Sequence, residues 1–181
     1  MTGAVPFLTM TRLIEDPVLR QRYSFERRDD VLIVDMWVDP GGGVTPHVHP
    51  AMEERFRVLE GRAEFLAGRT WTEAREAVVS PGTRHAFRNR GDVPAHIVCE
   101  ARPPSTLQAF LEDVAGLSRS GAITRIGLPR TPKGLLQGAV LAHHYRDMAV
   151  LGFPLPPPAV LAPLAKLGER LGYRAGEFSR L

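Results

Sequence analysis

With 181 residues and 44% hydrophobic content, the chain can bury one core of ordinary domain size and carry an appendage. Its single cysteine, Cys99, excludes an internal disulfide framework and a cysteine-based zinc cluster, and we expect a small buried hydrophobe there. The formal charge of +3 comes from arginines scattered among acidic residues, with Lys133 and Lys166 the only lysines. This scatter argues against a nucleic-acid partner.

The two most apolar stretches of the chain do not indicate a membrane protein. The first eleven residues carry no side-chain charge, and Pro6 interrupts their apolar patch, so they lack the features of a secretory signal. Residues 148–165 are uncharged but contain five prolines, which a continuous membrane-spanning helix would not tolerate. We therefore expect a cytoplasmic protein with no membrane partner.

Short runs of β-forming residues, separated by turn residues such as Asp-Pro-Gly-Gly-Gly and Arg-Gly-Asp, fill the chain from about residue 23 to residue 102. The predicted strands are residues 23–27, 31–38, 55–59, 62–66, 76–80, 84–89 and 95–101. Many short strands with regular turns predict a sandwich or a barrel.

From Pro103 onward the apolar residues follow a helical period. Ser105 and Gln108 have the spacing of a capping box at the start of a first helix, and a second helix is expected from Thr131 toward Gly152. A third apolar stripe falls within residues 161–171. We predict a barrel with an N-terminal arm in residues 1–103 and a helical extension in residues 104–181, whose stripes pack on the barrel or across a two-fold homodimer.

Two segments carry the residues that suggest chemistry. In an extended strand His47 and His49 point to one side, and after a turn at Pro50-Ala51 the next strand begins with Glu54 on the face that also carries Phe56 and Val58. In the second segment His85 and Phe87 share a face after a tight turn. Three imidazoles and one carboxylate suit Fe, Mn, Ni, Cu or Zn and leave one or two positions for water or substrate.

These segments resemble the two motifs of the cupin superfamily. The first motif reads Gly-x5-His-x-His-x4-Glu-x6-Gly, where x is any residue. The second motif reads Pro-Gly-x2-His-x3-Asn. The matching residues here are Gly41, His47, His49, Glu54, Gly61, Pro81, Gly82, His85 and Asn89. Two positions differ from the family pattern, because Arg75 stands where a glycine usually opens the second motif and Ser80 replaces a proline.

The resemblance implies a mainly β fold, a cupin or jelly-roll barrel followed by a C-terminal helical extension. It also implies that His47, His49, Glu54 and His85 hold one metal ion, and the spacing to Gly61 favours Glu54 over Glu53. The remaining histidines are expected outside this site: His96 in a structural role, and His143 and His144 as a poor chelating pair, because adjacent helical residues point about 100° apart.

The predicted pocket lining is apolar: Met36 with Trp37, Phe56, Val58, Phe65 and Phe87. A hydrophobic or aromatic small molecule that binds metal through an oxygen is therefore expected. The leading hypothesis is a dioxygenase that resembles the quercetinase-like cupins, with Fe(II) preferred over Ni, Mn, Zn or Cu, and with Glu54 as fourth ligand or catalytic base. The alternatives are a metal-dependent isomerase or cyclase, and a non-catalytic small-molecule-binding module whose tail engages a partner.

Overall fold

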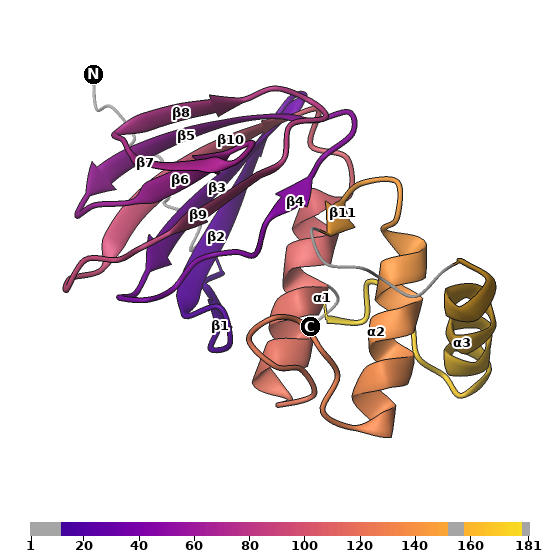
Figure 1. Cartoon of the computed structure of the whole chain (residues 1–181). Helices are drawn as coiled ribbons and strands as arrows, with labels where there is room; N and C mark the ends of the chain where they lie inside the picture. The colour runs from indigo at the N-terminus through magenta and orange to yellow at the C-terminus, as the bar shows by residue number, and fades with distance from the viewer. Residues whose placement is uncertain (1–11, 152–157, 179–181) are drawn as a thin grey trace, which may run out of the picture.

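A computed structural model describes residues 12–151 and 158–178 of the chain. Its strands form two antiparallel sheets that face each other, with the helices beside them (Figure 1). The six-stranded sheet has the order β1 (Ile14–Asp16), β2 (Gln21–Arg28), β3 (Val31–Val38), β10 (Ala95–Arg102), β5 (Glu53–Glu60), β8 (Glu76–Val79). The five-stranded sheet has the order β11 (Val150–Leu151), β4 (His47–Val48), β9 (His85–Arg88), β6 (Glu64–Ala67), β7 (Thr70–Glu73). The predicted mainly β jelly-roll fold is confirmed.

The core lies between the two sheets and follows the two-residue period of the strands. On β3, Leu32, Val34 and Met36 are at most 5% exposed, whereas the residues between them are only partly buried. Strand β10 pairs with β3 and brings Ile97 and Cys99 to the same inner face. Each such buried side chain contributes about 1.5–3 kcal/mol relative to exposure, so this alternation fixes which face of the sheet turns inward.

The predicted strands agree with the structure within two residues at each end, and residues 31–38 coincide with β3. Strands β1, β7 and β11 were not predicted from the sequence. Strands β1 and β11 are three and two residues long, too short for a periodic signal, and no residue of β7 is fully buried. These elements depend on long-range pairing rather than on local pattern.

Helices α1 (Leu107–Arg119), α2 (Pro132–His144) and α3 (Pro158–Arg170) form the extension. Helix α2 begins after Thr131, as the sequence predicted, and the Thr131 side chain caps it by accepting a hydrogen bond from the Gly134 backbone nitrogen at 2.9 Å. The prediction of a capping box at the start of α1 was wrong. Ser105 adopts a φ of 45°, and the N-cap residue is Thr106, whose side chain makes no capping hydrogen bond.

Helix α2 ends at His144 and does not continue toward Gly152, which lies outside the described residues. The chain turns at Tyr145, whose carbonyl accepts hydrogen bonds from the backbone nitrogens of Met148 and Ala149, and β11 then pairs with β4. The extension therefore returns a strand to the barrel, a connection that helical periodicity does not reveal.

The extension packs against the open end of the barrel where β4 and β11 meet (Figure 1). Helix α1 contacts β1, and the Tyr23 hydroxyl of β2 donates to the Leu111 carbonyl at 2.8 Å, so the packing predicted for the first stripe is confirmed. Helix α3 packs on α2 and leaves Leu167 and Leu171 exposed. The homodimer and the division between residues 103 and 104 stay predictions.

No helix among the described residues is long and apolar enough to span a membrane.

Asn89 joins two turns of the barrel through its fully buried amide. Its Nδ2 donates to the carbonyls of Val38 and Val93, and its Oδ1 accepts from the Gly91 backbone nitrogen. We expect Asn89→Ala to lower the free energy of unfolding in urea by about 2–4 kcal/mol, because it leaves buried backbone groups without partners. The exposed neighbour Arg90→Ala serves as control, and equal stability of the two variants would contradict this role.

Candidate metal centre

Four side chains from both sheets converge inside the barrel. His47 on β4 lies opposite His85 on β9 in the five-stranded sheet, and Glu54 comes from β5 of the other sheet. His49 follows β4 directly. One ligand atom from each of these residues lies within 4.8 Å of those of the other three, and His49, Glu54 and His85 are at most 6% exposed. The structure thus brings together the four residues that the two sequence motifs indicate.

Backbone carbonyls fix the orientation of all three imidazoles. His47 Nδ1 is 2.9 Å from the Thr45 carbonyl, His85 Nδ1 is 2.8 Å from the Thr83 carbonyl, and His49 Nδ1 is 2.9 Å from the Met148 carbonyl. Because a carbonyl only accepts, each Nδ1 must carry the proton and donate. In a neutral ring the Nε2 lone pair is then free to bind a metal, the second-shell arrangement usual for metal-binding histidines.

The close approach of Glu54 to two histidines fits a cation-binding site. His85 Nε2 lies 2.7 Å from Glu54 Oε2, and His49 Nε2 lies 3.7 Å from Glu54 Oε1. Glu54 Oε2 and His85 Nε2 are buried, yet neither makes a hydrogen bond of acceptable geometry. Buried polar atoms without such a partner are costly, and a divalent ion among three imidazoles and a carboxylate would satisfy them. The donor set therefore fits a transition metal.

The electrostatics of the cluster favour neutral His47 and ionised Glu54. Burial, assisted by the charges of His85 and His49, lowers the pKa of His47 from 6.5 to about 4. Burial alone would raise the pKa of Glu54, but the approach of His85 and the charge of His49 lower it below 4.5. Burial would likewise lower the pKa of His85, yet Glu54 raises it above 6.5.

Cys99 lies beside the cluster, with its Sγ 3.8 Å from Glu54 Oε1. Burial, together with the charge of Glu54, raises the pKa of its thiol well above the usual 9.0. The thiol therefore stays protonated, and Cys99 is not among the four converging residues. Cys99 is buried, as the sequence predicted, and its contact with Glu54 is an additional finding.

The Met148 carbonyl ties the helical extension to the cluster, and sequence reasoning missed this contact. Met148 is 99 residues from His49, and no periodic signal connects the two. The turn that presents Met148 is held by Tyr145, whose hydroxyl donates to the fully buried Asp113 of α1 at 2.8 Å. Asp113 also accepts from the backbone nitrogens of Gly176 and Phe178. Asp113 therefore joins α1, the Tyr145 turn and the end of the chain behind His49.

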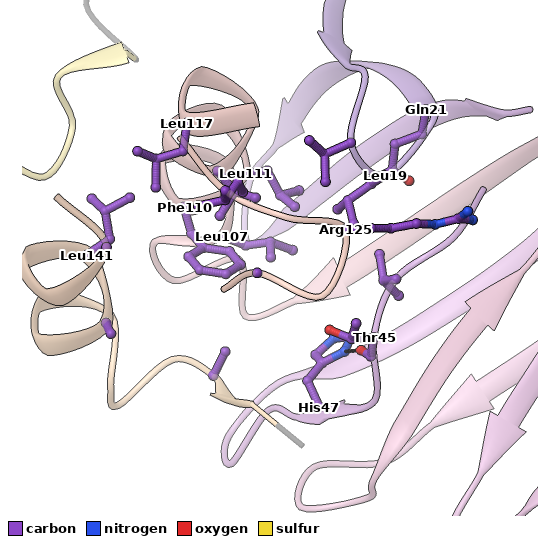
Figure 2. A pocket seen from close by; sticks show the side chains of 18 of the residues that line it. Leu19, Gln21, Thr45, His47, Leu107, Phe110, Leu111, Leu117, Arg125 and Leu141 are labelled. Carbon is purple, nitrogen blue, oxygen red and sulfur yellow. Dashed lines mark hydrogen bonds between the residues drawn. The ribbon is translucent and has the colours of Figure 1, made fainter. Parts of the chain in front are cut away.

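A cavity of about 630 Å³ extends from the cluster to the helices, with His47 at its edge near Thr45 (Figure 2). Of the predicted lining residues, Met36, Phe56 and Phe87 border this cavity, whereas Val58 and Phe65 lie in the core outside its lining. Phe65 packs against Phe56 with ring centroids 5.4 Å apart. Val58 lies four residues beyond Glu54 on β5, which carries it away from the cluster.

The remaining histidines lie outside the converging group. His96 Nε2 is 2.5 Å from Asp35 Oδ1, and its ring stacks on Trp37 with centroids 4.5 Å apart. The expected structural setting for His96 is found, but the expectation that Trp37 lines the pocket was wrong, because strand alternation turns it away from Met36. His143 is partly buried and His144 is exposed at the end of α2.

Comparison with known proteins agrees with this geometry. The family model described as a cupin domain matches residues 34–99. That segment contains all four converging side chains. Residues 34–99 form a cupin domain. No protein with a curated description is significantly similar to the chain.

Solved structures similar to this chain cover about half of its length. A double-stranded β-helix protein from Klebsiella pneumoniae is 27% identical, with a TM-score of 0.43 over 46% of this chain and 76% of that one. A predicted oxalate decarboxylase from Thermotoga maritima is 16% identical, with a TM-score of 0.44, and the match covers 46% of this chain and 80% of that one. A sugar phosphate isomerase from Silicibacter pomeroyi is 18% identical, with a TM-score of 0.43, and the match covers 46% of this chain and 59% of that one. The activities in these names are those of the named proteins.

The Tyr145 hydroxyl offers a direct test of the link between extension and cluster. We expect Tyr145→Phe to raise the dissociation constant for a divalent metal by about tenfold, because the Met148 carbonyl loses the support that holds His49. Competition with a chromophoric chelator measures this constant. Tyr173→Phe is the matched control, since the Tyr173 hydroxyl has no partner in the described part of the chain. Equal metal affinity of the two variants would contradict the link.

Proposed function

We propose that this cupin is a metal-dependent dioxygenase that acts on a small hydrophobic or aromatic oxygenated substrate. The observation that carries the proposal is the position of the ligand cluster at the edge of an apolar cavity. His47, His49 and Glu54 line the same cavity as Phe56 and Phe87. A substrate oxygen can therefore approach the cluster while the rest of the molecule contacts apolar walls.

Fe(II) is the preferred metal, with Ni, Mn, Zn and Cu as alternatives, because imidazole nitrogen together with carboxylate oxygen suits all of them. When bound, such a metal supplies Lewis-acid and, for iron, one-electron redox chemistry. The chain provides His47, His49 and His85 as neutral ligands oriented by backbone carbonyls. Glu54 provides a negative charge that offsets part of the charge of the ion.

Glu54 is also placed to accept a proton. Its lowered pKa keeps it ionised at neutral pH, and it borders the cavity, so a substrate hydroxyl within reach can transfer its proton to a carboxylate oxygen. The apolar walls exclude water from this step and strengthen the interaction of the resulting oxyanion with nearby positive charge. The protonated Cys99 thiol lies against Glu54 Oε1 and does not compete as a base.

Dioxygen is the co-substrate in this proposal. Both of its atoms enter the product and the substrate supplies all four electrons, so no external reductant is needed. An isomerase or cyclase would use the same ligands and the same base without oxygen, and a binding module would use them without turnover. Oxygen dependence therefore separates the leading proposal from both alternatives.

Metal content gives the first test. We expect the purified protein to contain about one transition-metal ion per chain and the double variant His47→Ala, His49→Ala to contain almost none, because two of the four ligands are removed. Inductively coupled plasma mass spectrometry measures both. The double variant His143→Ala, His144→Ala removes two histidines outside the cluster and should retain the metal. Equal metal in all three proteins would remove the basis of the proposed enzyme.

Oxygen consumption gives the second test. With metal-loaded protein and a panel of aromatic enols and phenols, turnover should stop under argon, and Glu54→Gln should reduce kcat at least about 100-fold, because general-base catalysis is lost. An oxygen electrode and product chromatography measure these effects. Undiminished turnover under argon would overturn the dioxygenase proposal and favour an isomerase or cyclase.

A further inference from the structure

The cavity is larger than the metal cluster requires. Beyond the barrel, its walls are apolar side chains of the extension, including Phe110, Leu111 and Leu117 of α1 and Leu141 of α2 (Figure 2). Leu164 of α3 also lines it. Its volume of about 630 Å³ is in the range of pockets that enclose small organic ligands. The walls favour an elongated or polycyclic apolar molecule over a sugar.

Gly138 leaves part of this space open. It lies in the interior of α2 and lines the cavity, and a Cβ built on it would meet no atom within 4 Å. Its φ lies outside the left-handed range, so the backbone does not require glycine. A glycine inside a helix costs about 1 kcal/mol relative to alanine. Neither packing nor backbone geometry explains Gly138, and a ligand in the adjoining space would.

The polar rim of the cavity is positively charged. Arg125 is the one charged residue among the described lining residues outside the metal cluster, and Figure 2 shows it extending from its loop toward the strand side where Leu19 and Gln21 lie. Arg125 Nη2 and Arg20 Nη1 lie 3.8 Å and 3.6 Å from the point where a Cβ would stand on Gly41. Two exposed guanidinium groups, one of them from the lining residue Arg125, therefore lie close together beside Gly41.

Neither guanidinium is neutralised within the described chain. Arg20 and Arg125 make no ion pair there, and the nearby Asp39 carboxylate is 3.9 Å from Arg22 instead. Gln21, also in the lining, is 4% exposed, and its Oε1 has no hydrogen-bond partner among the described residues. An amide can rotate to present its N–H groups, so Gln21 can donate to an anion in the cavity that Arg125 also lines. Planar guanidinium groups match carboxylate oxygens in pairs.

We propose that the cavity binds an elongated apolar molecule that ends in a carboxylate, with the carboxylate at Arg20 and Arg125 and the apolar body along α1 and α2 beside Gly138. The opposite end of the bound molecule then reaches the metal-binding side chains His47, His49 and Glu54. Only this last statement rests on the proposed function, because the arginines and apolar walls act without a metal.

Dodecanoate and dodecanol serve as matched probes, with dodecanoate used below its critical micelle concentration and dodecanol below its aqueous solubility. Isothermal titration calorimetry with the protein as isolated and after treatment with a chelator should show dodecanoate binding at least about tenfold tighter than dodecanol in both forms. The double variant Arg20→Gln, Arg125→Gln should lose this preference and retain the affinity for dodecanol. Arg69→Gln, Arg90→Gln changes two exposed arginines outside the cavity lining and should bind as the wild type does.

Gly138→Leu tests the apolar part of the site. Its side chain should fill the open space and weaken binding of both probes at least about tenfold, whereas Gly138→Ala should fold with equal or greater thermal stability and weaken them less. Equal affinity of the wild type for the two probes, or unchanged dodecanoate binding in the Arg20 and Arg125 variant, would overturn the proposal. A carboxylate preference that vanishes on metal removal would also overturn it, because the metal would then be the anion site. If the purified protein contains no metal but still prefers dodecanoate over dodecanol through Arg20 and Arg125, that result would contradict the proposed enzymatic function and leave the binding proposal intact.

Discussion

Three hydrogen bonds from imidazole Nδ1 atoms to backbone carbonyls are the constraint on which the candidate site depends. They place the proton of His47, His49 and His85 on the outer nitrogen, so each neutral ring presents its Nε2 lone pair to the interior. Glu54 enters from the opposite sheet with a carboxylate 2.7 Å from His85. Because a buried polar atom without a hydrogen-bond partner is costly, the meeting of Glu54 Oε2 and His85 Nε2, neither with an acceptable hydrogen bond, is evidence for a cation site rather than for an ordinary polar core.

The three histidines are held in two different ways. His47 and His85 each donate to a carbonyl two residues earlier, so local strand geometry sets their orientation. His49 instead donates to Met148, which the extension supplies across 99 residues. The ligand cluster and the helical extension are therefore coupled through this buried contact and through the pairing of β11 with β4, the strand that carries His47. The extension also builds most of the apolar wall of the cavity, so it contributes both to the ligand geometry and to the selection of what can approach it.

Much of the barrel could be predicted from the sequence because its strands bury alternate residues. The period-two pattern of residues 31–38 predicts β3, and the spacing of the two motifs indicates the residues that converge. The rest depends on contacts between distant segments. Strand β11 and the Met148 carbonyl involve the backbone, whose pairing leaves no trace in side-chain pattern. The alternation that predicts strands also turns Trp37 outward, a consequence that the pocket hypothesis overlooked.

X-ray absorption spectroscopy at the edge of the bound metal identifies the atoms that coordinate it. We expect a first shell of nitrogen and oxygen only, at about 2.0–2.2 Å, with the multiple-scattering signature of three imidazoles. Cys99 is the natural rival ligand because its sulfur lies 3.8 Å from Glu54. A sulfur scatterer near about 2.3 Å, or a shell with fewer than two imidazoles, would contradict the proposed centre.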